Sequence, residues 1–421
     1  MTKKETILIL GGDGYLGWSA GLAFANRTDY NVVLVDSLVK REWEKEVDAK
    51  LLVPFLSPEE RIHAYRDIFG KENLSFEKVC LLDAEEVRKL IERHNPTCII
   101  NAAQQPSAPF SMMNAKNAAA TFSNNIIGHL NVLWGIAEVN KDILYIKLGS
   151  AGCYMDIDTN YVPLSKVDMT FLHNGETHTI LNSWLPMQAT DFYHQSKISD
   201  FLISDLSAKT WGMRTITVQQ STIFGATIEE NRPVGHHALS TRFNYDAVFS
   251  TVLNRFVCQL AVHHPLTVYG DGTQKTGIIS LADSVENLIA LARSHVAPGE
   301  HQIVHNYTHR LSIKDMAERL TKAAGSAQVQ HIENPRVEPK GVLSRTVEVH
   351  PTLQEQHKDK DKKLSQELGY FVEFAELYKD NIDTSIILPT VAWSKHSKKD
   401  KNHTSHILPH MVQRNRHEKV A

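Results

Sequence analysis

Cysteine and long apolar runs are both scarce in this chain of 421 residues. Its four cysteines, Cys80, Cys98, Cys153 and Cys258, lie far apart, and none belongs to a C-x-x-C pair. This spacing indicates neither a disulfide framework nor a zinc site. No apolar run reaches the length of a membrane span, and Ile7–Leu10 is too short for the core of a signal peptide. We therefore expect a soluble, cytoplasmic protein with no membrane partner.

The chain also lacks a strong excess of charge of either sign. Its 45 lysines and arginines face 48 aspartates and glutamates, which gives a formal net charge of −3. Residues 395–421 hold seven bases and two acids, so this end carries +5 and the rest of the chain −8. A nucleic-acid-binding protein would be clearly basic, so we expect no nucleic-acid partner. The basic end shows no helical periodicity, and we interpret it as a solvated, disordered tail.

Short apolar segments alternate with helical patterns over the first half of the chain. The segments predicted to be strands are Thr6–Leu10, Asn31–Val35, Leu74–Val79, Thr97–Asn101, Leu144–Leu148 and Arg214–Gln219. Helical patterns are found at Tyr15–Asn26, Ala84–Arg93 and Ala115–Val139. Such alternation is typical of βαβ units. We predict an α/β fold with a Rossmann-like, doubly wound parallel sheet and a smaller C-terminal substrate-binding domain.

A glycine-rich turn follows the first predicted strand. Gly11, Gly14 and Gly17 precede a predicted helix, where glycine permits positive φ and a close approach of the backbone to a pyrophosphate. Asp36 ends the second strand, 19 residues after Gly17, where an acid binds the adenosine ribose and favours NAD over NADP. The alternative is an ordinary βα turn. We predict an NAD site with contacts from Gly11, Asp13, Gly14, Tyr15, Leu16, Gly17, Asp36 and Ser37.

A tyrosine and a lysine four residues apart, Tyr193 and Lys197, fall on one face of a predicted helix. A nearby ammonium favours the phenolate and lowers the pKa of a tyrosine toward working pH. Ser150 follows the strand Leu144–Leu148, where its hydroxyl is placed to hold a substrate oxygen. Tyr193 alone is more simply a buried structural tyrosine. Together with the glycine turn, the three residues predict catalysis.

The rhythm of strands and helices changes after about residue 226. We predict an NAD-binding Rossmann domain at residues 1–230, a mainly substrate-binding domain at 231–394 and the tail at 395–421. The polar segment Met155–Asn182 is expected to be an active-site insertion or lid. The pairs His236–His237 and His263–His264 invite a metal interpretation. Adjacent histidines point to different sides and no carboxylate is suitably spaced, so we predict no metal site.

These residues resemble the extended short-chain dehydrogenase/reductases, a family of NAD-dependent nucleotide-sugar epimerases and dehydratases, and within it the subgroup of UDP-sulfoquinovose synthases. The similar stretches are Gly11–Trp18, Ser107–Met112, Asn124–Leu133, His173–Gly175, Phe192–Lys197, Asn244–Phe249, His264–Gly270 and Asn334–Glu338. The resemblance implies a tightly held NAD and transient oxidation of the C4 hydroxyl of a UDP-glucose-like nucleotide sugar. It also implies a homodimer.

The resemblance assigns roles by position. It implies that Tyr193 takes the proton of the C4 hydroxyl, Ser150 hydrogen-bonds this hydroxyl, and Lys197 binds the nicotinamide ribose. It further implies cofactor contacts from Asp83 and Asn125, and substrate contacts from Gln105, Gln220, Lys275 and Arg336.

The sequence departs from the subgroup near the expected reaction centre. Pro106 stands where the subgroup has an arginine, which argues against sulfite as a substrate. Ala151 and Gly152 replace the Asp–Glu pair of the 4,6-dehydratases, and Cys153 replaces a glutamate of the subgroup. Two further functions stay open: a 4-epimerase or dehydratase that uses no sulfite, and a catalytically inactive protein that binds NAD or nucleotide sugars. The retained tyrosine, lysine and serine argue against the last.

Overall fold

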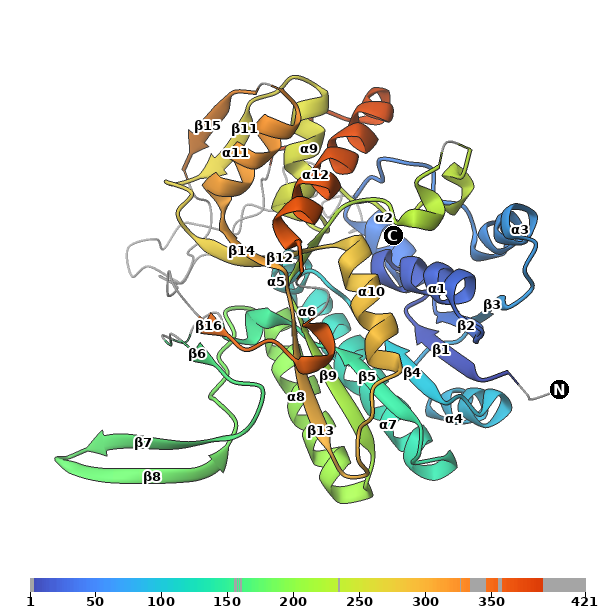
Figure 1. Cartoon of the computed structure of the whole chain (residues 1–421), viewed down its shortest axis with the longest axis vertical. Coiled ribbons are helices and arrows are strands. Elements are labelled where there is room, and N and C mark those ends of the chain that lie inside the picture. Colours follow the sequence, from blue (N-terminus) through green and yellow to red (C-terminus); the bar gives the residue numbers. More distant parts are fainter. Residues whose placement is uncertain are drawn as a thin grey trace, which may run out of the picture.

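A seven-stranded parallel sheet forms the centre of the computed structural model, which describes residues 4–154, 157, 159, 161–233, 235–325, 327–333, 346–354 and 358–388. The strands lie in the order β13-β9-β5-β4-β1-β2-β3 (Figure 1). Their bounds are β1 Thr6–Leu10, β2 Asn31–Asp36, β3 Leu74–Lys78, β4 Cys98–Asn101, β5 Leu144–Leu148, β9 Arg214–Gln220 and β13 His301–Asn306. The predicted α/β fold with a doubly wound parallel sheet is thus confirmed.

Helices cover both faces of this sheet, which explains why the strands β1 and β4 at its centre are mostly apolar and buried. Ile7 and Ile9 of β1 pack toward α1 (Tyr15–Arg27), α3 (Pro58–Phe69) and α10 (Leu281–Ala292). Leu8 and Leu10 pack in a second cluster with side chains of α4 (Ala84–His94) and α7 (Gly128–Val139). The helix α8 (Phe192–Trp211) lies beside α7 on that face. The strand ends near Gly11 and Gly149 therefore meet at one edge of the sheet.

The smaller helices near this edge are α2 Val39–Glu46, α5 Ala108–Met113 and α6 Ala115–Phe122. The predicted helix Ala115–Val139 runs through α6 and α7, which a π-helical turn at Ser123–Ile127 joins.

A second apolar core lies above the strand ends and includes Phe256, Leu320 and Phe371 (Figure 1). Its main elements are α9 Val252–Ala261, α11 Ile313–Ala323, α12 Lys360–Leu377 and β11 Leu266–Tyr269, and β15 Val329–Ile332 pairs with β11. A three-stranded sheet lies between the two cores, with β10 Thr222–Phe224, β12 Lys275–Ser280 and β14 His309–Ser312. The chain returns to the central sheet through α10 and β13, so residues beyond 230 serve both parts; the three predicted domain ranges stay predictions.

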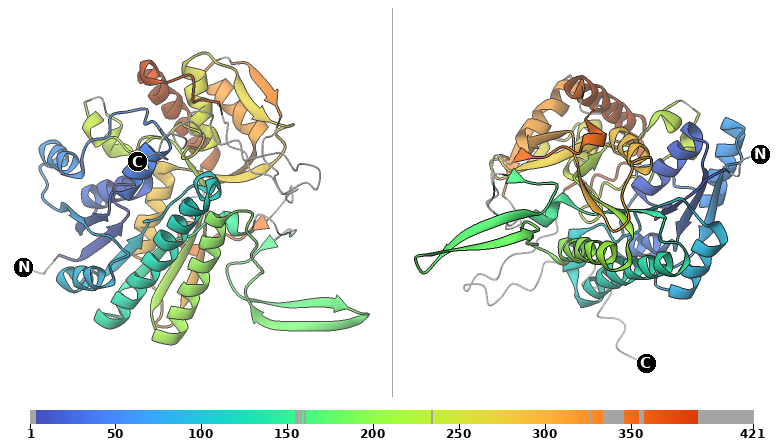
Figure 2. Two further views of the ribbon diagram at one scale, coloured as in Figure 1. Left: turned by 180° about the vertical axis from the view of Figure 1, so that it is seen from behind. Right: turned by 60° about the horizontal axis from the view of Figure 1, so that its bottom comes forward.

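A two-stranded antiparallel ribbon, β7 Val167–His173 and β8 Glu176–Ser183, extends away from the body of the molecule (Figures 1 and 2). Asn174 and Gly175 join its strands with φ of 51° and 85°, as the tight turns of hairpins require. Nearby, β6 Tyr161–Val162 pairs with β16 Thr346–Val347. The lid prediction for this segment is wrong for the ribbon, because its two strands pair only with each other and none of their residues lines the cavity described below.

Within the part of the chain that the structure describes, no helix is long and apolar enough to cross a membrane. The predicted tail, residues 395–421, lies outside the described residues.

Candidate active site

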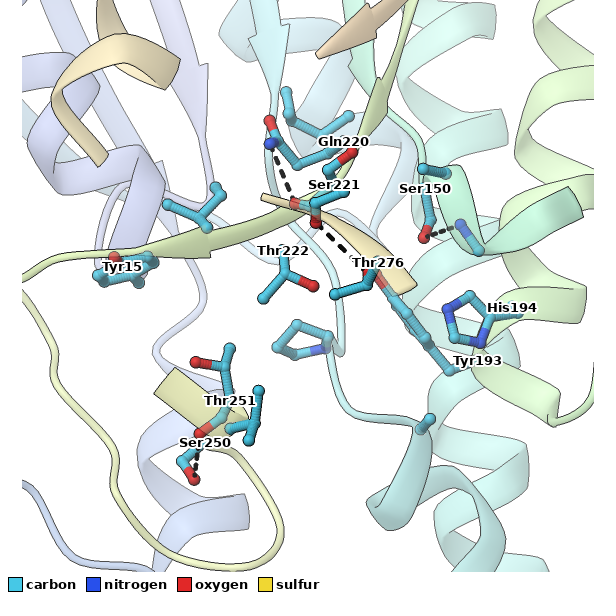
Figure 3. Close-up of a pocket in the computed structure, with 18 of the residues that line it drawn as sticks. Tyr15, Ser150, Tyr193, His194, Gln220, Ser221, Thr222, Ser250, Thr251 and Thr276 are labelled. Atoms are coloured by element: carbon cyan, nitrogen blue, oxygen red, sulfur yellow. Dashed lines mark hydrogen bonds between the residues drawn. The ribbon is translucent and has the colours of Figure 1, made fainter. Parts of the chain in front are cut away.

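A cavity of about 710 Å³ opens at the carboxyl ends of the central strands, where open α/β sheets bind their ligands. Its lining comes from the glycine turn after β1, from Leu148–Ser150 after β5, from Tyr193 on α8, and from β12 and α9. In Figure 3, Ser150, Tyr193 and His194 lie together on one side of the cavity, with Ser250 and Thr251 across from them. The two apolar cores thus meet around one site.

The glycine turn is shaped so that only glycine fits at its two ends. Gly11 has a φ of +83°, and a Cβ atom there would lie 2.6 Å from the backbone nitrogen of Ala103. A Cβ atom on Gly17 would lie 2.0 Å from the carbonyl oxygen of Gly11. The residue before α1 is Gly14, which has no capping side chain, so the first N–H groups of α1 are left for an anion. Five residues predicted to contact the cofactor line the cavity: Gly11, Gly14, Tyr15, Leu16 and Gly17.

Asp36 is held at the end of β2 by two backbone amides. Its carboxylate accepts hydrogen bonds from the nitrogen of Asp13 at 3.0 Å and from that of Leu38 at 2.7 Å. Burial raises the pKa of Asp36, and these hydrogen bonds oppose the rise. Ser37 follows, and its hydroxyl accepts from the nitrogen of Val39 at 3.4 Å. The carboxylate thus keeps a fixed position next to the glycine turn.

The Asp13 carboxylate is occupied by three arginine side chains. Arg41 binds it through two nitrogens at 2.8 Å, and Arg61 and Arg242 also pair with it. Burial raises the pKa of Asp13, but the three arginines together lower it by more, so the pKa of Asp13 lies below its usual value. Asp13 therefore anchors the turn through its side chain.

The three predicted catalytic residues come together in the structure. Burial raises the pKa of the Tyr193 phenol, and a hydrogen bond with Ser150 opposes this rise. The Ser150 hydroxyl oxygen also accepts from the nitrogen of Gly152 at 3.1 Å. The Lys197 ammonium lies 5.9 Å from the centre of the Tyr193 ring and donates to the carbonyl of Leu148 at 3.1 Å. A buried phenol of this kind needs nearby positive charge to act as a base.

Sequence reasoning missed a histidine–aspartate pair beside this set. The Nδ1 atom of His194 lies 2.7 Å from the carboxylate of Asp191, the residue that caps α8. Burial raises the pKa of Asp191, and its hydrogen bonds and charge pairing with His194 more than offset this, so the pKa is lowered. A Cβ atom on Gly152 would lie 2.2 Å from Nε2 of His194, so glycine makes room for the ring. The sequence held a signal for this pair: Asp191 stands three residues before His194 at the start of a helix, a spacing that brings the two side chains together.

Gln220 and Lys275, which are predicted to bind the substrate, both line the cavity. The Gln220 side chain accepts from Nδ2 of Asn306 at 2.8 Å and donates to the carbonyl of Ser221 at 3.1 Å. Two further cations, Arg255 on α9 and Arg310 on β14, also line it. No local pattern marks them, because Arg310 reaches the site through the antiparallel pairing that sets it opposite Gly277.

Other predicted contacts do not line the cavity. Gln105 is buried, and its side chain bonds the nitrogen and carbonyl of Ser107. Asn125 bonds the backbone of Gln105 on both sides and the hydroxyl of Ser196. Asp83 is an exposed cap of α4. These assignments stay predictions, and Arg336 lies outside the described residues. Among the residues described, no group of three or more histidine, cysteine, aspartate or glutamate side chains could hold a metal ion.

Comparison with known proteins identifies the family. The model of the NAD dependent epimerase/dehydratase family matches residues 7–305. The chloroplastic UDP-sulfoquinovose synthase of Spinacia oleracea is 33% identical over 93% of this chain and 80% of its own length. The UDP-sulfoquinovose synthase of Sulfolobus acidocaldarius is 30% identical, over 92% and 98% respectively. A UDP-glucuronic acid 4-epimerase from Bacillus cereus, solved with UDP-glucuronic acid and NAD, shares the fold with a TM-score of 0.63 and 16% identity, covering 88% of this chain and 99% of its own. The chain belongs to the NAD-dependent epimerase/dehydratase family and is an enzyme of this type.

Proposed function

We propose that this enzyme oxidises the C4 hydroxyl of a UDP-glucose-like nucleotide sugar transiently, as part of a reaction related to that of the UDP-sulfoquinovose synthases. The observation that carries the proposal is that Tyr193 and Ser150 line the cavity next to the glycine turn, with the buried Lys197 ammonium 5.9 Å from the centre of the Tyr193 ring. Two relatives at 33% and 30% identity carry the name UDP-sulfoquinovose synthase, which supports the substrate class.

The residues of the site fit a dinucleotide. The turn at Gly11 and Gly17 leaves no space for a Cβ atom, and the first amides of α1 are available to a pyrophosphate. In this proposal the Asp36 carboxylate accepts hydrogen bonds from the hydroxyls of the adenosine ribose, and the Lys197 ammonium donates hydrogen bonds to the hydroxyls of the nicotinamide ribose. NAD supplies the acceptor of the C4 hydride when it is bound. We assign the remaining chemistry to side chains of this chain.

Two pairs of side chains handle protons in this proposal. Tyr193 takes the proton of the C4 hydroxyl, and Ser150 holds the sugar oxygen in line with the phenol. His194, oriented by Asp191, is the second group in the cavity that can carry a proton, at the side where Gly152 leaves space. A C4 ketone acidifies the neighbouring C5 proton, so a second proton carrier suits a reaction that continues beyond oxidation.

In this proposal, cationic side chains on the other side of the cavity bind the nucleotide end of the substrate. Arg255, Arg310 and Lys275 all line it and come from elements beyond residue 250. Guanidinium groups bind phosphates with two parallel hydrogen bonds, so these side chains suit a diphosphate. We propose on this basis that the region beyond residue 230 mainly binds the nucleotide sugar.

A second candidate reaction, epimerisation or dehydration without sulfite, is favoured by Pro106. This proline lines the cavity and offers neither charge nor an N–H group to an anion. Incubating the purified enzyme with UDP-glucose, with and without sulfite, and following products by mass spectrometry separates the two. A sulfite-dependent product supports the first reaction, and an isomer or dehydrated sugar formed without sulfite supports the second. Tyr193→Phe should abolish both and leave NAD bound; a Tyr193→Phe variant with full turnover contradicts the proposal.

We further propose that the enzyme is a homodimer. Phe192, Leu202 and Leu206 on α8 are 47%, 52% and 62% exposed, and Trp134 on α7 is 49% exposed. These apolar side chains lie on the outer surface of two adjoining helices, which is the pattern of a helix pair that packs against another. We also propose a reducing, cytoplasmic location, since all four cysteines are unpaired.

A further inference from the structure

A lysine that no part of the proposed mechanism uses lies buried beneath the site. Lys147 on β5 points to the α7/α8 face of the sheet, and its side chain is 1% exposed. It does not line the cavity. A fully buried lysine is rare unless it is paired, because its ammonium loses its hydration. Burying the Lys147 ammonium therefore costs free energy that its surroundings must offset.

Lys147 and Lys197 share one oxygen of Asp200. The Nζ atom of Lys197 lies 2.9 Å and that of Lys147 3.4 Å from Oδ2 of Asp200. The side chains of Asp200 and Lys197 are both fully buried. Solvent therefore screens this group of three charges very little.

The other groups around the three charges are neutral or already paired. His129 of α7 faces Asp200, and burial lowers the pKa of this histidine to about 3, so its ring is uncharged. The ring bonds the hydroxyl of Tyr145, the other polar side chain of β5 on this face. The neighbouring strands place Asn101 and Thr217 next to Lys147, and neither titrates. The charged groups that face Lys147 are thus Asp200 and Lys197.

Charge balance shows what the second lysine does. Asp200 raises the pKa of Tyr193, because its negative charge disfavours the phenolate; Asp191 and Cys153 act in the same direction. With Lys197 as the only cation, the ammonium and the Asp200 carboxylate would cancel. With both lysines charged, the group carries a net charge of +1 close to the phenol.

We propose that Lys147 is a positioning residue for C4 oxidation: its ammonium offsets Asp200, so that the charge of Lys197 stays available to the Tyr193 phenolate and to the nicotinamide ribose. This inference rests on Tyr193 as the base of the proposed function. It adds a residue that touches neither substrate nor cofactor.

The proposal carries a pH signature. Burial lowers the pKa of Lys147 to about 7, and Asp200 opposes the fall. The ammonium is therefore present below this pH and is lost above it. Lys147 should help Tyr193 below neutral pH and become indifferent in alkali.

Lys147→Met tests this in the full-length, NAD-loaded enzyme, because methionine keeps the length and removes the charge. The readout is the rate at which NADH absorbance rises after mixing with UDP-glucose, across the pH range. We expect the variant to be about ten-fold slower near pH 6, because the loss of one buried charge that favours the phenolate shifts its pKa by about one unit. Above about pH 8.5 its rate should meet that of the wild type. A loss of equal size at every pH overturns the proposal.

Two further measurements separate this inference from the proposed function. The affinity for NAD, measured by titrating the cofactor-free protein, needs no turnover. Lys147→Met should weaken this affinity near pH 6, where the Lys147 ammonium is charged, and leave it unchanged above about pH 8.5; an unchanged affinity near pH 6 overturns the inference whatever the substrate is. In an Asp200→Asn background Lys147 has no charge to offset, so Lys147→Met should add nothing. The same pH-dependent loss in that background also overturns it.

Discussion

The backbone nitrogen of Asp13 donates a hydrogen bond of 3.0 Å to the carboxylate of Asp36. This contact joins the glycine turn to the end of β2, so the turn proposed to bind the pyrophosphate also sets the position of the acid proposed to bind the ribose. The side chain of Asp13 instead forms an ion pair with Arg41 of α2. Of these two neighbouring carboxylates, that of Asp13 stabilises the fold, and that of Asp36 is the one we propose for the ligand.

Asp36→Asn should weaken NAD binding by about ten-fold or more and narrow the preference over NADP, because an amide forms weaker bonds with the ribose hydroxyls and no longer repels a 2′-phosphate. Titration of the cofactor-free protein with each dinucleotide gives both dissociation constants. Glu77→Gln, a change in the acid of β3 that pairs with Arg93 and His94, is the matched control. An unchanged NAD to NADP ratio in Asp36→Asn would contradict the assignment.

Asp13→Asn should lower the free energy of unfolding by about 3–5 kcal/mol at neutral pH, since it leaves three arginines without their shared carboxylate. Urea unfolding measures this. The folded-state pKa of Asp13 is lowered, so its contribution is present above its unfolded pKa of about 3.9 and is lost as the pH falls. The gap between wild type and variant should therefore close in acid. Asp67→Asn, at a carboxylate that is 65% exposed, should show no such gap.

Gly152→Ala should reduce turnover by about 100-fold while NAD still binds, because the new methyl group would displace the ring of His194 from Asp191. Gly369→Ala on α12 is the control, since its Cβ atom meets nothing within 4 Å. Steady-state rates and NAD content of both variants decide the matter. A Gly152→Ala enzyme as active as Gly369→Ala would remove His194 from the proposed proton carriers.

Arg310→Met should raise the KM for UDP-glucose by about ten-fold or more and leave NAD affinity unchanged, because this cation faces the cavity from β14 and not from the glycine turn. Arg293→Met, at an exposed arginine after α10, should leave KM as it is. Equal effects on NAD and on substrate would indicate a general loss of structure.

Leu206→Glu should convert the proposed dimer to a monomer, because it buries a charge in the helix surface that α7 and α8 expose. Light scattering coupled to size exclusion measures the mass. Leu377→Glu at the end of α12, where leucine is 72% exposed, changes the same residue type at a distant place and should not alter the mass. A wild-type protein that is monomeric contradicts the dimer directly.

Local patterns were sufficient for the strands that helices cover on both faces. The segments Thr6–Leu10 and Leu144–Leu148 match β1 and β5 residue for residue, because a short, mostly apolar run that ends at a glycine favours a buried strand. β13 was missed, since polar residues such as His301 and Asn306 occupy its ends. Their burial and pairing become visible only once β9 lies alongside.

The residues of the candidate site also divide into those that local sequence patterns indicate and those that depend on the fold. Glycine spacing and the interval between Tyr193 and Lys197 are local; the structure brings the glycine turn and Tyr193 to one cavity and places the Lys197 ammonium 5.9 Å from the Tyr193 ring. Arg310 and the sharing of Asp200 by two lysines depend on contacts between distant segments, which no spacing encodes. The ribbon held a usable signal that was not used, since Asn174 and Gly175 between two extended runs are typical of a hairpin.

The late arrival of β13 has a consequence for how the protein is made. Until residues 301–306 leave the ribosome, β9 is an open sheet edge with unpaired amides and carbonyls, a template for pairing with other chains. A fragment ending near residue 230 would keep that edge exposed permanently. The central sheet is therefore completed by a strand that the chain delivers only after α9, β11 and β12 of the other part have been synthesised.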